Sequence, residues 1–302
     1  MLNRRHFLKS GSLAALASGA FWTGRSFAQG AADIGVATSA DIDTAVRGAV
    51  AEVGGIEKFV KRGNSVAIKP NLSFASPVER ATTTNPQVVA SVVRLCQEAG
   101  AARVVILDNP MQDAAVIGAN SELAALVKGM KNTSIFLPVN ESLYRETAIP
   151  QGMVMKSTKT AAILDEMDVL INVPIAKNHS ATAVSLGIKG NLGLVWDRMA
   201  YHNSSDFNQS MADLATIVKA DLTIIDAIRI LLTRGPQGPG RVQQFNTIIA
   251  GTDPVAVDSY AVSFGWKQWD LAGKNVEHLV KAAEMGLGKL DASSLNVVTR
   301  TL

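Results

Sequence analysis

The chain has 302 residues, of which 47% are hydrophobic and 18% charged, and its formal net charge is +3. This composition is typical of a globular protein with a sizeable core and argues against a disordered chain. The single cysteine, Cys96, excludes an intrachain disulfide and a four-cysteine iron–sulfur site. Cys96 also follows a valine-rich stretch at helical spacing, so we expect it in the core rather than at a reactive site.

The N-terminus matches a twin-arginine export signal. Asn3-Arg4-Arg5-His6-Phe7-Leu8-Lys9 carries the arginine pair, a short apolar stretch runs to Trp22, and Ser26-Phe27-Ala28 offers small residues at the cleavage positions. We therefore expect residues 1–28 to be a signal peptide cut before Gln29. The mature protein, residues 29–302, would then work in the periplasm or elsewhere outside the cytoplasm, with the twin-arginine export machinery as its first partner.

An uncleaved membrane anchor is the alternative interpretation of this segment. A spanning helix needs about 20 predominantly apolar residues. The stretch here is shorter and is interrupted by Thr23, Gly24 and Arg25. Cleavage is therefore favoured, and we expect no stable membrane span in the mature protein.

The leader also accounts for the basic character of the chain. It contains Arg4, Arg5, Lys9 and Arg25 and no acidic residue, so removing these four charges from +3 leaves a mature chain of −1. Nucleic-acid and anionic-membrane binding both need a basic patch on the folded domain. The composition gives no case for either, and we expect no nucleic-acid partner.

Strand-like and helix-like segments alternate along the mature chain. Alternation of apolar strands with helices predicts an α/β fold, in which a largely parallel sheet carries helices on both faces. No repeat or linker is visible, so we expect a single domain with inserted loops and a small β excursion within residues 142–157. The expected strands are 65–69, 102–107, 134–139, 168–173, 222–225, 244–250 and 295–298, and the expected helices are 86–99, 113–130, 158–167, 206–219, 253–264 and 275–285.

Polar residues follow the ends of the predicted strands. In an open parallel sheet the ligand crevice lies at the carboxyl ends of the strands. Any one Asp or Asn could simply cap a turn after a strand, but five strands with such ends favour a ligand site. The residues are Lys69 and Asn71, Asp108 and Asn109, Asn172, Asp226, and Thr252 with Asp253.

Two long connections support this site. The first, residues 70–85, has 16 residues where loops of this kind usually take about 2–6. It places Thr82, Thr83 and Thr84 just before a predicted helix, where hydroxyls and free N–H groups suit an anionic ligand. Thr84 or Asn85 could equally serve as an ordinary helix cap.

The second connection, residues 174–202, is richer in chemically active groups. His179 and His202 could ligate a metal, act as an acid–base pair, or have structural roles. Lys177 and Lys189 supply positive charge for phosphate or carboxylate, and the glycines between them allow close approach of backbone to a ligand. A third histidine, His278, is expected at the surface of a late helix.

Two later aspartates complete the set of candidates. Asp253 precedes Pro254 at a predicted helix start, so a capping role is the simple interpretation. Asp258 lies in an apolar stretch of that helix, and a buried carboxylate there needs a partner. Between Asp226 and Asp253 in the sequence, the glycines and prolines of residues 235–240 predict a loop of fixed shape.

Taken in order, these motifs resemble the domain-of-unknown-function 362 family over residues 65–290. This chain departs from the family pattern at Gly190, which separates Lys189 from Asn191, and it lacks the cysteine-rich ferredoxin segment of some members. The family carries no general activity, so the resemblance implies site residues rather than a reaction. The motifs are Lys69-Pro70-Asn71, Thr83-Thr84, Asn172-Val173-Pro174 with Lys177 and His179, Leu186 to Lys189 with Asn191 and Gly193, Arg198 with His202, Asp226, Gly235-Pro236 with Gly240, and Gly251 to Asp258.

Two functions fit these observations. In the first, the protein is an enzyme for a small anionic or carbonyl substrate, with His179, His202, Lys177 and Asp226 as catalytic candidates. Its candidate ligand-binding residues are Lys69, Asn71, Thr83, Thr84, Asp108, Asn172, Lys189, Asn191, Gly193, Arg198, Gly235, Asp253 and Asp258. In the second, a non-catalytic protein delivers a metal or cofactor to a redox partner. A small molecule or a metal is the expected ligand, and the sequence leaves any cofactor unidentified.

Overall fold

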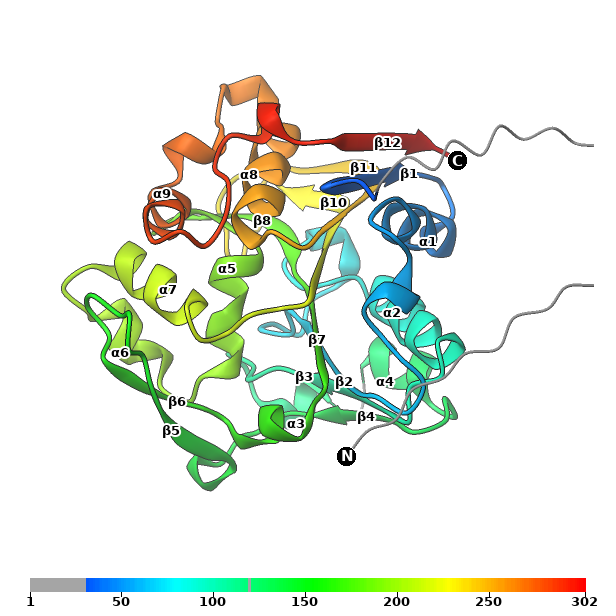
Figure 1. Cartoon of the computed structure of the whole chain (residues 1–302), viewed down its shortest axis with the longest axis horizontal. Helices are drawn as coiled ribbons and strands as arrows, with labels where there is room; N and C mark the ends of the chain where they lie inside the picture. Colours follow the sequence, from blue (N-terminus) through cyan, green and yellow to red (C-terminus); the bar gives the residue numbers. More distant parts are fainter. Residues whose placement is uncertain (1–30, 119–120) are drawn as a thin grey trace, which may run out of the picture. The chain divides into compact units, whose positions relative to one another are not determined.

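The computed structural model describes residues 31–118 and 121–302 (Figure 1). The expected signal peptide, residues 1–28, lies outside the described residues. The strands are β1 (Ile34–Thr38), β2 (Ser65–Pro70), β3 (Arg103–Leu107), β4 (Thr133–Phe136), β5 (Tyr144–Ala148), β6 (Ser157–Ala161), β7 (Val169–Val173), β8 (Ile175–His179), β9 (Ala183–Ser185), β10 (Leu222–Leu231), β11 (Val242–Gly251) and β12 (Val297–Thr301). The α-helices are α1 (Ile42–Glu52), α2 (Pro86–Glu98), α3 (Ala114–Ile117), α4 (Glu122–Val127), α5 (Gly187–Gly190), α6 (Arg198–His202), α7 (Phe207–Ala215), α8 (Pro254–Gly265) and α9 (Glu277–Glu284).

The central sheet has the strand order β12-β1-β11-β10-β7-β2-β3-β4, and β8 pairs with the far part of β10. Strands β4, β3, β2, β7 and β10 are parallel, and β12 is parallel to β1. Only β11 in this order runs against both of its neighbours. The predicted α/β fold with a largely parallel sheet is confirmed.

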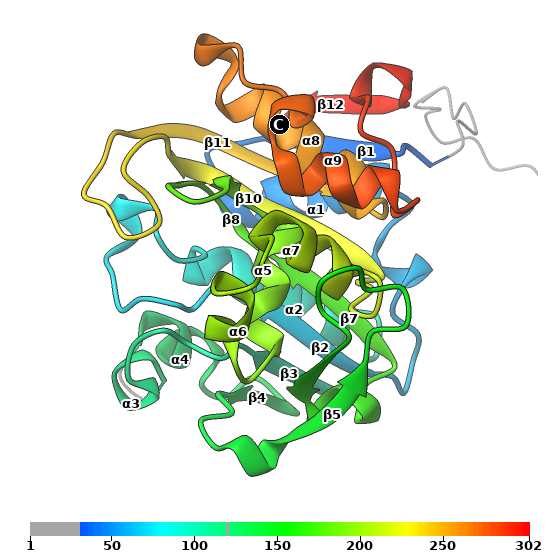
Figure 2. The same cartoon turned by 90° about the vertical axis from the view of Figure 1, so that its left-hand side faces the viewer.

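Helices cover both faces of the sheet, as Figure 2 shows from the side. Alternate residues of each strand supply the two cores, because successive side chains of a strand point to opposite faces. In β3, Val104 and Ile106 pack with α1, α2 and α4, whereas Val105 and Leu107 belong to the core under α5, α7, α8 and α9. The sheet is therefore buried on both sides around its middle.

Helix α2 forms where the sequence predicts it. Asn85 accepts a hydrogen bond from the Gln87 N–H and caps the helix, and Pro86 fills the first helical position, where its missing N–H costs nothing. Cys96 lies in the buried face of this helix, and burial raises the pKa of its thiol to about 12. The cysteine is a core residue, as predicted.

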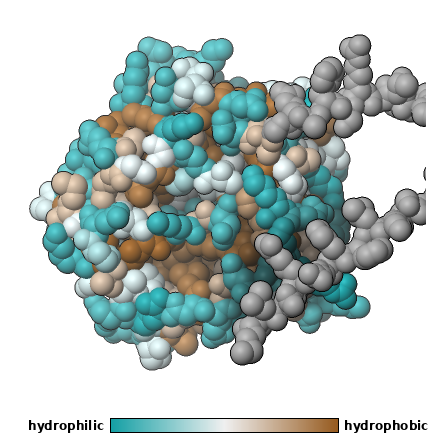
Figure 3. Space-filling view, viewed as in Figure 1, coloured by the Kyte–Doolittle hydropathy of each residue, from teal (hydrophilic) through white to brown (hydrophobic). Residues whose placement is uncertain are grey.

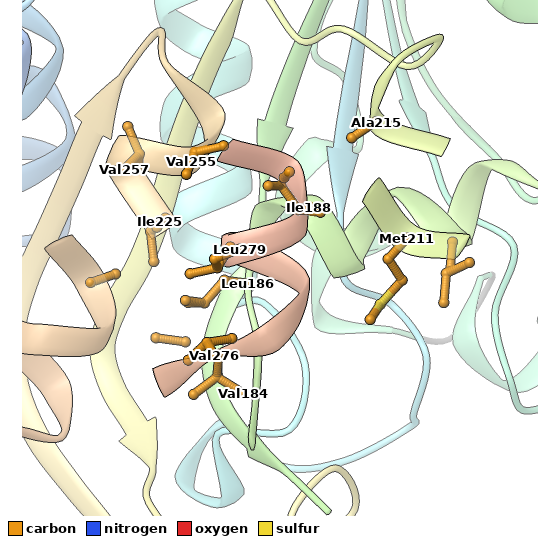
Figure 4. Close-up of a cluster of buried hydrophobic side chains, with 14 of the residues drawn as sticks. Val184, Leu186, Ile188, Met211, Ala215, Ile225, Val255, Val257, Val276 and Leu279 are labelled. Carbon is orange, nitrogen blue, oxygen red and sulfur yellow. The ribbon is translucent and has the colours of Figure 1, made fainter. Parts of the chain in front are cut away.

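The segment from β9 into α5 packs three apolar side chains into the core and contributes two polar side chains to a cavity. Val184, Leu186 and Ile188 are buried beside α9, where Figure 4 shows them near Val276 and Leu279. Ser185 in β9 and Lys189 in α5 line the cavity described below.

Several predicted elements differ from the structure. Residues 158–167 were expected to be helical, but β6 occupies 157–161 as the second strand of a hairpin with β5, and a 3-10 helix follows (Ala162–Glu166). The expected β excursion within residues 142–157 contains β5, whereas β6 lies almost wholly beyond it. Pairing with β5 overrides the weak local helical pattern. The expected helix at 113–130 is broken into α3 and α4.

Three further features were missed or misplaced. Strand β1, helix α1 and the β8–β9 hairpin are absent from the predicted elements. The strand expected to end before Asp226 continues to Leu231, so Asp226 lies inside β10. His278, expected at the surface, is fully buried in α9, where burial lowers its pKa to about 3.

Within the described ranges, no helix combines the length and apolarity that crossing a membrane requires. On the face shown in Figure 3, hydrophobic residues are interspersed with hydrophilic ones.

Candidate functional site

A small cavity lies at the carboxyl ends of β2 and β3, beside the β8–β9 hairpin. Its volume is about 150 Å³. The connection from α5 through a 3-10 helix (Asn191–Leu194) to α6 forms one side, and the loop around Pro236 and Gln237 forms another. The lining residues are Lys69, Asn71, Ser73, Phe74, Asp108, Met111, Lys177, His179, Ser185, Lys189, Gly190, Leu192, Gly193, Arg198, His202, Pro236 and Gln237.

A buried ion pair forms the base of the cavity. The Lys69 Nζ atom lies 3.0 Å from Asp108 Oδ1, and both side chains are almost fully buried. Lys69 also donates to the Pro70 carbonyl, and Asp108 Oδ2 accepts from the Leu72 N–H at 2.6 Å. Gly193 lies directly against this pair, because a Cβ atom at that position would be 1.8 Å from Asp108 Oδ1. Glycine is therefore required for this close approach.

Lys177 projects from β8 and is 1% exposed. Its Nζ atom donates to the Thr82 carbonyl oxygen at 2.5 Å and lies 4.9 Å from the centre of the Phe74 ring. Burial, reinforced by the positive charges of Lys189 and Lys69 against the weaker opposing effect of Asp108, lowers the pKa of Lys177 to about 7. At neutral pH a substantial part of this lysine is therefore the free amine.

Lys189 is placed by α5. The two carboxylate oxygens of Asp258 accept the N–H groups of Gly187 at 2.9 Å and Ile188 at 2.8 Å, which fixes the start of this helix. The Lys189 ammonium lies 5.5 Å from the Phe207 ring centre. Burial, with the charges of Arg198 and Lys69, lowers the pKa of Lys189 to about 8.

Arg198 completes the group of cations. Its guanidinium donates to the backbone carbonyls of Asn109 and Pro110, which follow β3. Burial lowers its pKa, although an arginine remains charged at physiological pH. Three lysines and one arginine thus line the cavity, and Asp108 is the one carboxylate among the described residues that line it.

The two candidate histidines have different environments. His179 is buried, and its Nδ1 atom accepts the Ala181 N–H at 3.2 Å, so its proton is on Nε2. Burial and the nearby lysines lower the pKa of His179 to about 3, and the ring is neutral. His202 is exposed at the rim, where its Nδ1 atom contacts the Arg198 carbonyl oxygen at 2.9 Å and its ring packs on Phe207.

Five of the predicted ligand-binding residues hold the loops of the site through hydrogen bonds. Thr83 and Thr84 donate to the carbonyls of Asn71 and Val173. Asn172 donates to the Gly187 carbonyl and to Asn191 Oδ1, which ties β7 to α5. Asn71 also lines the cavity itself.

Asp226, Asp253 and Asp258 do not line the cavity. Asp226 accepts the N–H groups of Asn85 and Ile228, and burial raises its pKa to about 6. Asp253 caps α8 and accepts the Lys289 N–H. The carboxylates of Asp226 and Asp253 therefore already accept hydrogen bonds from backbone N–H groups, and so does the carboxylate of Asp258. Burial raises the pKa of Asp258 to about 7.

The expectation that the strand before Asp253 ends at the same sheet edge is wrong. Strand β11 is antiparallel to β10, and its last residue, Gly251, pairs with Thr223 at the start of β10. Asp253 consequently follows β11 at the opposite edge of the sheet. Gly235, by contrast, lies beside the site, where its N–H donates to Asn178 Oδ1 and a Cβ atom would meet the Asn178 carbonyl at 1.6 Å.

Sequence reasoning missed several lining residues, above all Phe74 and Ser185. Ser185 pairs with Lys177 across the β8–β9 hairpin. The apolar alternation at 184, 186 and 188 could have assigned Ser185 to the face that carries Lys189. Phe74 lies in a long loop, and no sequence pattern indicates its position.

The described residues contain no group of three or more His, Cys, Asp or Glu side chains that could hold a metal ion. The candidate pair His179 and His202 both line the cavity, but lysines and an arginine surround them. Cations of this kind repel a metal ion.

The chain is similar to a curated protein in sequence and to a solved structure in fold. The thylakoid-associated protein sll1697 of Synechocystis sp. is 28% identical over 214 residues, which cover 68% of this chain and 64% of that protein. The match thus spans less than two thirds of the relative's length. The apoprotein of the lactate racemase from Thermoanaerobacterium thermosaccharolyticum superposes with a TM-score of 0.47 and 12% identity, covering 74% of this chain and 54% of the other.

A family described as a domain of unknown function, DUF362, matches residues 66–263, which include every cavity-lining residue named above. The match covers more than half of the chain, and the protein therefore belongs to the DUF362 family.

Proposed function

We propose that the protein is an enzyme whose substrate is a small anionic molecule bound in this cavity. The observation that carries the proposal is the charge of the lining, where Lys69, Lys177, Lys189 and Arg198 face a single carboxylate, Asp108. Buried cations are costly unless they are paired. An anion with carboxylate or phosphate groups would supply the missing negative charge.

The cavity also holds groups suited to proton transfer. A general acid or base works best when its pKa is near the operating pH, and Lys177 meets this condition. The neutral His179 ring can donate from Nε2 to a substrate oxygen. Asp226 is engaged by two backbone N–H groups, so its role is to support the loop around Asn85 rather than to reach a substrate.

Calorimetry with phosphate, sulfate, acetate and malonate tests the binding step. We expect the doubly charged anions to bind more tightly than acetate. In Lys189→Met the affinity should fall at least about tenfold, which corresponds to about 1.4 kcal/mol. Lys128→Met is the matched control, because Lys128 is exposed outside the cavity. Equal weak binding to wild type and Lys189→Met would contradict the proposal.

Turnover needs a second experiment. Native mass spectrometry of the purified protein identifies a small anion that copurifies with it, and incubation of that anion with fresh protein tests for conversion. Appearance of a product supports an enzyme. Full recovery of the anion supports the alternative of a binding protein that delivers its ligand to a partner.

A further inference from the structure

The three buried lysines of the cavity have different partners. Lys69 is paired with Asp108 and donates to the Pro70 carbonyl, so its ammonium is held in place. Lys189 is 9% exposed and lies over the Phe207 ring. Lys177 is the most deeply buried, and no described carboxylate forms an ion pair with it.

We propose that Lys177 is a nucleophile that forms an imine with the carbonyl group of an anionic aldehyde or ketone. This inference deepens the proposed function and rests on it, because the surrounding cations would bind the anionic group of the same molecule. It assigns the substrate class as small oxo acids.

The β8–β9 hairpin carries three polar groups that line the cavity. Lys177 and His179 are two residues apart in β8, so their side chains lie on the same face of the strand. Ser185 stands opposite Lys177 in the antiparallel register. All three residues line the cavity. A carbonyl group bound beside Lys177 would share the cavity with the His179 and Ser185 side chains.

The surroundings of Lys177 favour the free amine. Its one hydrogen bond among the described residues goes to the Thr82 carbonyl, which accepts one N–H and leaves the nitrogen lone pair available. Burial removes water from the amine, and Lys189 adds a nearby positive charge. Desolvation and a neighbouring cation are the two effects that activate a lysine as a nucleophile.

The remaining cations explain why the carbonyl compound should be an acid. Lys189 and Arg198 would bind a carboxylate, while Lys69 stays with Asp108. Glyoxylate and pyruvate are the simplest oxo acids that carry both a carbonyl group and a carboxylate, so they serve as probes. A cationic wall next to a reactive amine selects oxo acids over uncharged aldehydes.

The reaction balances without an oxidant or reductant. The Lys177 nitrogen attacks the carbonyl carbon, a C–N bond forms, and the carbonyl electron pair moves to the oxygen. That oxygen takes up one proton from the nitrogen and gives a carbinolamine. It then leaves as water with a second proton, and an imine remains. The Nε2–H of His179 can donate a hydrogen bond to the oxygen while it carries the developing charge.

Reductive trapping tests this inference directly. Wild-type protein is incubated with glyoxylate or pyruvate and cyanoborohydride near pH 7, and the adduct is located by peptide mass mapping. We expect one adduct per chain on Lys177, with a mass gain equal to the oxo acid less one oxygen atom. Lys177→Met should give no such adduct, and Lys128→Met should react like the wild type.

A second set of samples separates this inference from the proposed function. Excess malonate should suppress trapping by glyoxylate, and Lys189→Met should still be modified at Lys177 but need a higher glyoxylate concentration. An adduct on Lys69 or Lys189, or one spread over exposed lysines, would overturn the imine. So would tight anion binding in calorimetry with no trapping. If acetone, which is uncharged, is trapped at Lys177 as efficiently as pyruvate, the imine would stand but the assignment of an anionic substrate would be wrong.

Discussion

At the scale of single residues, burial sets the chemistry of this protein more than residue type does. Burial lowers the pKa of Lys177 from its usual 10.5 to about 7, which brings the free amine into the neutral range. Burial lowers the pKa of both His179 and His202, and the pKa of the more deeply buried His179 falls to about 3. The reactivity of the cavity therefore depends on desolvation.

The pKa of Lys177 predicts a specific pH dependence of stability. The pKa is about 7 in the folded protein against a usual value of 10.5, so between these values the unfolded chain binds more protons. The free energy of unfolding of the unliganded protein should therefore rise with pH across this window. Lys177→Met removes this contribution, and its stability relative to wild type should be highest below pH 7 and fall by a few kcal/mol towards pH 10. Urea unfolding at several pH values measures the difference in free energy of unfolding between Lys177→Met and wild type. A difference that does not change with pH would contradict the prediction.

Gly193 offers a second test at this scale. A Cβ atom there would lie 1.8 Å from Asp108 Oδ1 and 2.7 Å from Lys69 Nζ, and the Asn109 N–H holds the Gly193 carbonyl in place. Gly193→Ala should lower the free energy of unfolding by about 1–3 kcal/mol and abolish anion binding. Gly190→Ala is the matched control, because its nearest atoms would be 3.9 Å away. Equal effects of the two substitutions would show that the close approach is unimportant.

At the scale of elements, short segments are held by carboxylates placed far away in the sequence. The four-residue helix α5 is too short to be stable alone, and Asp258 in α8 binds two of its N–H groups. Asp226 in β10 likewise fixes the start of α2 through the Asn85 N–H. These aspartates support the cavity without touching its contents.

Asp258→Asn should therefore affect both stability and binding. The amide cannot accept both N–H bonds, and one buried donor is left unpaired at a cost of about 1–3 kcal/mol. Because Lys189 is carried by α5, anion affinity should fall as well. Asp253→Asn is the control, because Asp253 also accepts two backbone N–H bonds, which come from Ala256 and Lys289 rather than from α5. If both variants bind malonate equally well, α5 does not depend on Asp258.

Element prediction succeeded where local pattern and long-range pairing agree. Helix α2 has its cap, its proline and its valine stripe within one segment, and its predicted start is confirmed. Residues 157–161 form a strand because β5 pairs with them, and no local pattern records that partner. The end of the strand at Asp226 was misplaced for a related reason, since β8 and β11 extend the ladder of β10 to Leu231.

At the scale of the whole molecule, the cationic cavity contrasts with the net charge of −1 that residues 29–302 carry. Residues 1–28, the expected signal peptide, contribute four positive charges and no negative one. A local concentration of one charge attracts small anions without making the whole protein basic.

Export is the prediction that belongs to this scale. Replacing the arginine pair by Arg4→Lys with Arg5→Lys should abolish transport, because the twin-arginine machinery recognises that pair, and precursor should accumulate in the cytoplasm. Cell fractionation with immunoblotting measures the distribution. Lys9→Arg, which conserves the charge outside the pair, is the control. Continued export of the double variant would indicate a different route.

The sequence by itself determined the class of fold and most of the residues at the sheet edge. Lys69 and Asp108 come at the ends of apolar runs, and parallel strands end together, so local pattern was sufficient for them. Only the tertiary structure decided that β11 runs the other way and takes Asp253 to the opposite edge. It also decided the burial of Lys177, since the Thr82 carbonyl and the Phe74 ring come from a distant loop. Strand direction and desolvation depend on contacts between segments far apart in the chain, and no local pattern specifies them.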